Sequence, residues 1–269
     1  MNISSKNPRS ELTSRDLRDL KRAHELASQT PFIIRVSDVI GKLPTKALEV
    51  LPDKVSSHVA SATKKSLETA LNVALFTMDT SSKGEESNDW WHKFAVLLTG
   101  GVGGAFGFAA LAVELPITTG IMLRSIADIA RSEGEDLNQP RVRLECLNVF
   151  ALEGGKKNDD DADTGFLATR MALTRLLGEA AEYYMKKAGT KATAPVFVKL
   201  IEQIAAKFGV TVSQKVASQA IPVVGGVAGA TINTLFMDYY QDMARAHFIL
   251  RRLERKYPPE LIAEIYESL

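Results

Sequence analysis

A long uncharged stretch constrains this sequence more than any other feature. Residues 94–113 read FAVLLTGGVGGAFGFAALAV, and residues 221–237 (IPVVGGVAGATINTLFM) have the same character. Glycines repeat four residues apart in both, at Gly100–Gly107 and at Gly225–Gly229. This spacing places small residues on one stripe of a helix, where another backbone can approach closely. Because each glycine costs a helix about 1 kcal/mol, close packing must offset the loss. The pattern predicts two apolar helices nested at the centre of the fold.

The first stretch also has the length of a membrane-spanning helix, which needs about 20 apolar residues. Trp90 and Trp91 precede it, at the place of interfacial anchors. However, glycine and alanine make it only weakly hydrophobic, and Glu114 follows it directly. We therefore expect a buried helix, or one that dips into a membrane surface, rather than a span.

Composition bounds the class of protein. The chain has 269 residues, of which 45% are hydrophobic and 24% charged, as in folded globular proteins. A net charge of +1 argues against nucleic acid as a partner. The single cysteine, Cys146, excludes a disulfide framework and is expected to be a buried, inert thiol. The N-terminus has no apolar core of signal-peptide type. We expect a cytoplasmic protein, free or at the inner face of the membrane.

Apolar residues recur at helical spacing along most of the chain, and no strand alternation is found. Breaks are expected at Pro116 and Gly209, because proline and glycine interrupt helices. Residues 32–50 read as a short helix or a docking segment. The sequence therefore predicts an all-α, multi-helix bundle with two central glycine-rich apolar helices. Besides the central helix at residues 94–113, the expected helices cover residues 12–30, 55–78, 117–131, 140–150, 166–187, 195–209, 210–220, 222–257 (the second central helix) and 260–269.

One acidic loop resembles a calcium site only in part. Asp159, Asp161 and Asp163 alternate as calcium ligands do, but Thr164 and Arg170 stand where such a loop has glycine and glutamate. A solvated loop is the better interpretation, and no metal site is predicted.

Carboxylates and arginines on two helices are the best candidates for chemistry. On the late helix, Asp238, Asp242 and Arg245 share a stripe. Two like charges one turn apart need a cation, which Arg245 supplies locally or Arg124 or Arg131 supplies from the earlier helix. A charge network that fixes helix register, a polar binding or catalytic pocket, and a metal site between the aspartates all fit this pattern. Further polar residues that fit a pocket are Asn233, His247 and Arg251 on the late helix and Asp128 on the earlier one.

Glu114 is the other acid of interest. It stands directly before Leu115–Pro116, where it fits either a helix cap or a general base. Known catalytic signatures such as H-E-x-x-H and G-x-S-x-G are missing from the sequence. The basic cluster at residues 251–256 suits a helix C-terminus, or contact with anionic lipid headgroups.

Three segments together resemble the EcsC protein family. They are ELPITTGIMLRSIADIARSEGEDL (114–137), LECLNVFALEGG (144–155) and AIPVVGGVAGATINTLFMDYYQDMARAHFILRRLERKY (220–257). The resemblance covers roughly residues 55–257, so residues 1–54 are expected to be a helical extension and residues 55–269 an EcsC-like helical domain. The resemblance implies a bacterial protein and supplies no reaction.

Three functions fit these observations. The first is an interaction protein that associates peripherally with a membrane surface or a membrane protein complex, with Trp90 and Trp91 as anchors. The alternative is a hydrolase that uses Glu114, Asp128, Asp238 and Asp242 with arginines of a polar pocket. The third is a scaffold without a small-molecule site. The sequence identifies neither a cofactor nor an oligomeric state.

Overall fold

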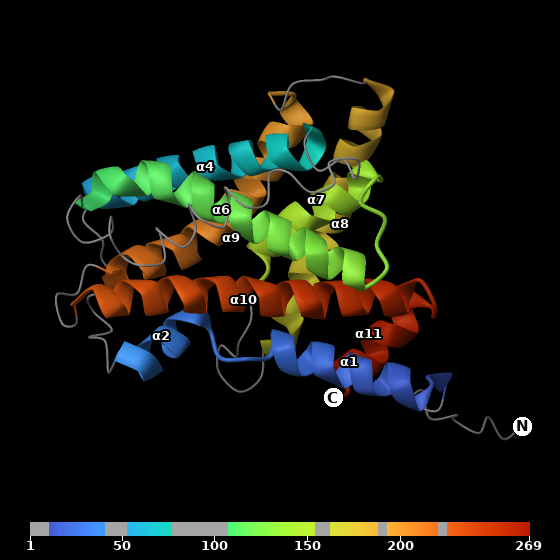
Figure 1. Ribbon diagram of the computed structural model, residues 1–269. Coiled ribbons are helices and arrows are strands. Elements are labelled where there is room, and N and C mark those ends of the chain that lie inside the picture. Colours follow the sequence, from blue (N-terminus) through green and yellow to red (C-terminus); the bar gives the residue numbers. More distant parts are fainter. Residues whose placement is uncertain (1–10, 41–52, 77–106, 154–161, 188–192, 220–224) are drawn as a thin grey trace, which may run out of the picture.

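The computed structural model describes residues 11–40, 53–76, 107–153, 162–187, 193–219 and 225–269 (Figure 1). Within these residues the structure is helical and contains no strand, which confirms the all-α bundle. The helices are α1 (Ser14–Ala27), α2 (Phe32–Ile40), α4 (Asp53–Phe76), α6 (Gly107–Ser132), α7 (Pro140–Asn148), α8 (Ala162–Lys186), α9 (Pro195–Gln219), α10 (Gly225–Glu254) and α11 (Pro259–Glu267), with a 3₁₀ helix η2 (Val149–Ala151) after α7.

Helix α10 runs through the middle of the molecule (Figure 1). On one side it packs against α6 and α9, and on the other against α1 and α2. Helices α6 and α10 are parallel, because the contacts between them advance together along both helices. Gln241 Nε2 donates to Ser125 Oγ at 2.9 Å, and ten residues further along α10 Arg251 contacts Glu135, just beyond α6. The two helices that carry the uncharged stretches therefore begin at the same end of the molecule.

Aromatic rings fill the core where η2, α9 and α10 meet. Phe150, Phe208, Phe236 and Tyr240 are buried, and their ring centroids lie 4.9 to 6.1 Å apart in edge, tilted or stacked pairs. Such pairs add about 0.5–1.5 kcal/mol each beyond the area they bury. Cys146 is fully buried, as expected, and burial raises the pKa of its thiol well above the usual range.

The break expected at Glu114 and Pro116 is wrong. Helix α6 continues through Pro116 to Ser132. Proline removes the hydrogen bond to the carbonyl of Ala112, but Ala112 is exposed, so water can satisfy that carbonyl. The buried side chains of Leu111 and Leu115 hold both halves of the helix against the core. Glu114 consequently lies inside a helix and caps nothing.

The helix break expected at Gly209 is also wrong. Gly209 does not end a helix, because α9 runs without interruption from Pro195 to Gln219. Buried Phe208 and Val212 on either side outweigh the propensity cost of about 1 kcal/mol. At Gly229, a Cβ atom would meet no atom of the described residues within 4 Å, so none of the described backbone segments lies close to it. The helices nest further along, at Ser125 and Gln241; residues 94–106 lie outside the described residues.

The N-terminus of α1 and the C-terminus of α6 end in residues that favour helix caps. Thr13 is the N-cap of α1, and its hydroxyl accepts a hydrogen bond from the backbone N–H of Asp16 at 3.2 Å. After α6, Gly134 adopts a left-handed conformation with φ of 79°. None of the described helices has an apolar run long enough to cross a bilayer.

Candidate functional site

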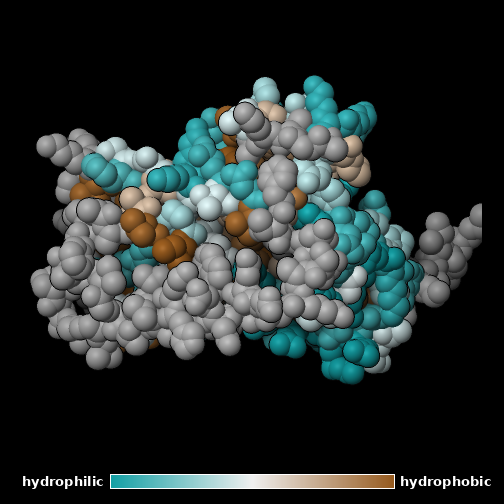
Figure 2. All heavy atoms as spheres, turned by 45° about the horizontal axis from the view of Figure 1, so that its top comes forward, coloured by the Kyte–Doolittle hydropathy of each residue, from teal (hydrophilic) through white to brown (hydrophobic). Residues whose placement is uncertain are grey.

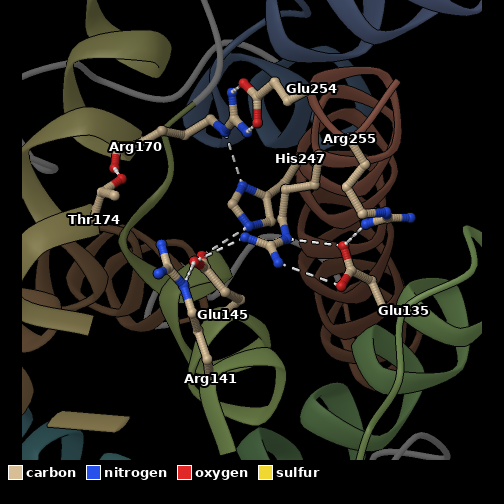
Figure 3. Close-up of polar contacts among 9 residues, drawn as sticks. Glu135, Arg141, Glu145, Arg170, Thr174, His247, Glu254 and Arg255 are labelled. Atoms are coloured by element: carbon tan, nitrogen blue, oxygen red, sulfur yellow. Dashed lines mark hydrogen bonds and ion pairs between the residues drawn. The ribbon is translucent and has the colours of Figure 1, made fainter. Parts of the chain in front are cut away.

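A buried network of charges joins three helices and the turn after α6 (Figure 3). We call it the Glu145–His247 network; its members are Glu135, Glu145, Arg170, His247, Arg251, Glu254 and Arg255. Glu145 comes from α7, Arg170 from α8 and His247 from α10. All three side chains are at least nine-tenths buried. Because buried charges are costly unless they are paired, the helices that carry these side chains must stay in contact in the folded protein.

His247 lies at the centre and its two ring nitrogens have different partners. Arg170 Nε donates to Nδ1 at 3.0 Å, and Nε2 lies 3.2 Å from Glu145 Oε2. Since Nδ1 accepts, the proton of the neutral ring is on Nε2 and faces the carboxylate. Burial lowers the pKa of His247 and the charges of Arg170 and Arg251 lower it further, against the opposing effect of Glu145. The ring is therefore neutral at pH 7.

Glu145 is ionised although it is almost completely buried. Burial alone raises its pKa, but the 3.2 Å contact with His247 and the charges of Arg251 and Arg170 outweigh that effect and hold the pKa at about 2. Its other oxygen, Oε1, accepts from Arg251 Nη1 at 2.9 Å. The carboxylate is thus compensated on both sides.

Two arginine–glutamate pairs close the network at its rim. Arg170 binds Glu254 through two parallel hydrogen bonds of 2.9 Å, the geometry in which guanidinium and carboxylate fit best. Arg251 Nε donates to Glu135 at 2.9 Å, and Arg255 contacts the same carboxylate. The left-handed turn at Gly134 directs Glu135 back toward α10.

The geometry of this network favours a structural role over a catalytic one. A general base must contact the group that it deprotonates, whereas His247 is 2% exposed and both ring nitrogens face protein partners. Among the described residues, no group of three or more histidine, cysteine, aspartate or glutamate side chains is arranged to hold a metal ion. The arrangement is suited to fixing α7, α8 and α10 in one register.

The predicted stripe on α10 lies away from this network and is bound by α2. Asp242 accepts from Arg35 of α2 at 3.1 Å and from Arg245 at 3.2 Å. The cation from another helix is therefore Arg35, where the sequence suggested Arg124 or Arg131. Asp238 is on the exposed side of the stripe. Partial desolvation and the charge of Asp242 raise its pKa, and the charges of Arg245 and Arg35 lower it by less.

Glu114 has one strong partner. Lys215 of α9, whose side chain has no exposed surface, donates to Glu114 Oε1 at 2.9 Å. The ammonium nitrogen also lies 5.0 Å from the ring centroid of Phe236, a cation–π contact. This pair ties α6 to α9 at the end of the molecule where α10 begins.

The remaining predicted residues are distributed over several surfaces. Asp128 and Arg131 are exposed and pair with each other at 2.6 Å on α6. Asn233 accepts from Gln219 at 3.3 Å, and Arg124 is partly exposed on α6. Trp90, Trp91 and the acidic loop at Asp159 and Asp161 lie outside the described residues. Glu114, Asp128 and Asp242 thus pair with cations on α9, on α6, and on α2 and α10, respectively. Asp238 shares the stripe of Asp242 on α10.

Cations of the basic cluster at the end of α10 face acids of the protein itself. Arg252 binds Glu133 at 2.7 Å and Asp19 of α1 at 2.9 Å. Lys256 contacts Asp16 of α1. These contacts hold α1 along α10 in an antiparallel direction.

Sequence reasoning missed the most buried charged residues. Glu145 and Arg170 have apolar neighbours in the segments LECL and ATRMAL. A charge at a helical position whose i±3 and i±4 neighbours are mostly apolar is the signal that could have found Arg170, since Phe166, Leu167 and Leu173 occupy three of those four positions. Their partners could not be paired from the sequence, because Glu145 and His247 are 102 positions apart.

Comparison with known proteins adds a family. The model of the EcsC protein family matches residues 15–253, which is most of the chain and includes α1 through nearly all of α10. No curated protein and no solved structure matches the chain.

Proposed function

The chain belongs to the EcsC protein family, and we propose that it is a helical interaction protein that docks on a membrane surface through one uncharged end. We define the uncharged end as residues 107–113 of α6 and 225–237 of α10. The observation that carries the proposal is the parallel course of these two helices. The uncharged segments of α6 and α10 both lie at the start of their helices, at the same end of the molecule. The paired charges of the Glu145–His247 network lie at the opposite end.

Exposed apolar side chains surround the uncharged end. Val113 of α6 is 66% exposed, and Ile34 and Val39 of α2 are about half exposed. Helix α2 is held on the uncharged half of α10 by Phe32, which packs against Phe236 and Tyr239. Figure 2 shows hydrophobic side chains gathered on the left, the side on which α6 and α10 begin, and mostly hydrophilic ones on the right. Apolar groups of this kind favour transfer from water into the interfacial region of a bilayer.

The inner face of the cytoplasmic membrane is the surface that we propose. A chain with one cysteine, buried and without a disulfide partner, suits a reducing compartment. Asp38, which is also exposed on α2, suits the headgroup region rather than the hydrocarbon core. A membrane protein complex is a second partner with the same chemistry, and a hydrolase remains a prediction that rests on the carboxylates alone.

Substitution of Val113 by glutamate tests the proposal. The full chain should bind vesicles of phosphatidylcholine and phosphatidylserine in a flotation assay, and V113E should bind at least about tenfold more weakly, because a buried valine contributes about 1.5–3 kcal/mol. The matched control is M185E, since Met185 is 64% exposed in the last turn of α8, and that end of α8 lies away from the end of the molecule where α6 and α10 begin (Figure 1). The proposal fails if the full chain does not bind any vesicle, or if V113E and M185E bind equally.

A further inference from the structure

Helix α1 separates its own charges between two faces. Its acids turn inward: buried Asp16 accepts from Tyr257 at 2.7 Å and contacts Lys256, and Asp19 binds Arg252. Burial raises the pKa of Asp16, but hydrogen bonds from Lys256, Thr13 and Tyr257 outweigh it and hold that pKa far below its usual range. Asp16 is therefore ionised, and both acids face cations at the end of α10.

The cations of α1 point the other way. Arg15, Arg18, Lys21 and Arg22 are all exposed, and none of them has an ion pair or hydrogen bond to a side chain in the part of the chain that the structure describes. Their spacings of three and four residues place them on adjoining stripes of the outer face. Glu11 and Glu25 are exposed at the two ends of this face, so the cations occupy its middle turns. Over seven residues this stripe is about 10 Å long.

This asymmetry is unlike the basic cluster of α10. In that cluster, the arginines and the lysine form ion pairs with acids of the same protein. Binding of an external anion there would have to replace those ion pairs. On α1, Asp16 and Asp19 pair with Lys256 and Arg252 at the end of α10, so these acids do not neutralise the cations on the outer face of α1. The outer face of α1 is therefore positively charged. The pairing inside thus determines the charge outside.

We propose that the outer face of α1, formed by Arg15, Arg18, Lys21 and Arg22, binds the headgroups of anionic phospholipids. This inference rests on the proposed function, which it deepens by naming the lipid class. Helices α1 and α2 lie along the same side of α10, α1 beside its C-terminal half and α2 beside its uncharged half. The exposed cations of α1 and the exposed Ile34 and Val39 of α2 thus belong to two helices on one side of α10. A surface that presents both cations and apolar side chains is typical of proteins that bind an anionic membrane.

Lipid is favoured over nucleic acid as the anion. The stripe is short, the net charge of the chain is only +1, and the exposed apolar side chains of α2, on the same side of α10, have no role on a phosphate backbone. The cytoplasmic leaflet of a membrane carries anionic lipids whose attraction for each nearby cation corresponds to about a fivefold change in partitioning.

Removal of two of these cations tests the inference. R18Q/R22Q should lower partitioning of the full chain onto vesicles of phosphatidylcholine with phosphatidylserine by about 25-fold, and leave its binding to pure phosphatidylcholine unchanged. Glutamine keeps the helix propensity, and circular dichroism verifies the fold. K65Q/K199Q is the matched control, because it removes two exposed lysines from α4 and α9, which lie on the other side of α10.

The outcomes separate this inference from the proposed function. If the full chain binds the mixed vesicles and R18Q/R22Q binds them as well as K65Q/K199Q, the α1 inference is overturned and the proposed function stands. If no vesicle is bound, both fail. If double-stranded DNA is bound in place of vesicles and R18Q/R22Q abolishes that binding, the surface is real but lipid is the wrong partner, and the inference is overturned.

Discussion

Replacing Glu145 with glutamine should lower the free energy of unfolding by about 3–5 kcal/mol, because it removes one partner of a buried charge pair. Arg251 would then keep only Glu135, and the proton on His247 Nε2 would face a neutral amide. Urea denaturation followed by circular dichroism measures the change. E179Q is the control: Glu179 is an exposed partner of Arg175, and its loss should cost at most about 1 kcal/mol.

The pH dependence of stability provides a second test of the E145Q substitution. The pKa of Glu145 is about 2 in the folded protein, against an ordinary 4.5, so its contribution to stability is present above pH 4.5 and is lost as the pH falls toward 2. At about 1.4 kcal/mol per pKa unit, this amounts to about 3 kcal/mol. The stability difference between wild type and E145Q should therefore shrink over that interval. A difference that is as small as that of E179Q, or that does not change with pH, would show that Glu145 is not held as an ion.

Removing Glu114 should be almost as damaging. E114Q leaves the ammonium group of Lys215 buried without a counter-charge, and we expect a loss of about 3–5 kcal/mol. K215M should cost less, because the carboxylate of Glu114 is 15% exposed and can reach water. The double variant E114Q/K215M should recover most of the stability, since well-packed neutral groups often replace a buried ion pair without cost.

A double-mutant cycle on these three variants measures the coupling between Glu114 and Lys215. We expect a coupling of at least about 3 kcal/mol. Additive effects would mean that the two residues do not compensate each other, and the place of Glu114 inside α6 would then need another explanation.

Helix positions were largely predictable because they depend on local patterns. The spacing of Met122, Ile126 and Ala130 predicts the buried face of α6, and Pro140 predicts the start of α7. The errors at Pro116 and Gly209 have one cause. Propensity acts over a few residues, whereas the buried neighbours of both positions belong to a core assembled from distant segments. Tertiary packing therefore outweighed two local signals.

The charge networks were less predictable, since each one joins residues that are far apart in sequence. The acid–cation stripe on α10 was visible from spacing alone, and Arg245 does contact Asp242. Its second cation, Arg35, comes from α2, a segment whose packing no pattern reveals. The division of the chain at residue 54 stays a prediction, although the family match begins at residue 15 and α1 is joined to α10 by ion pairs.

A fluorophore at the uncharged end tests the proposed membrane contact most directly. Cys146 is fully buried, so a thiol-reactive, polarity-sensitive dye can be attached selectively to V113C or to M185C. On vesicles of phosphatidylcholine and phosphatidylserine, the emission of the dye at position 113 should shift to the blue as it leaves water, and the dye at position 185 should not change. An unchanged spectrum at position 113 on vesicles that carry the bound protein, or an equal shift at both positions, would contradict docking through the uncharged end.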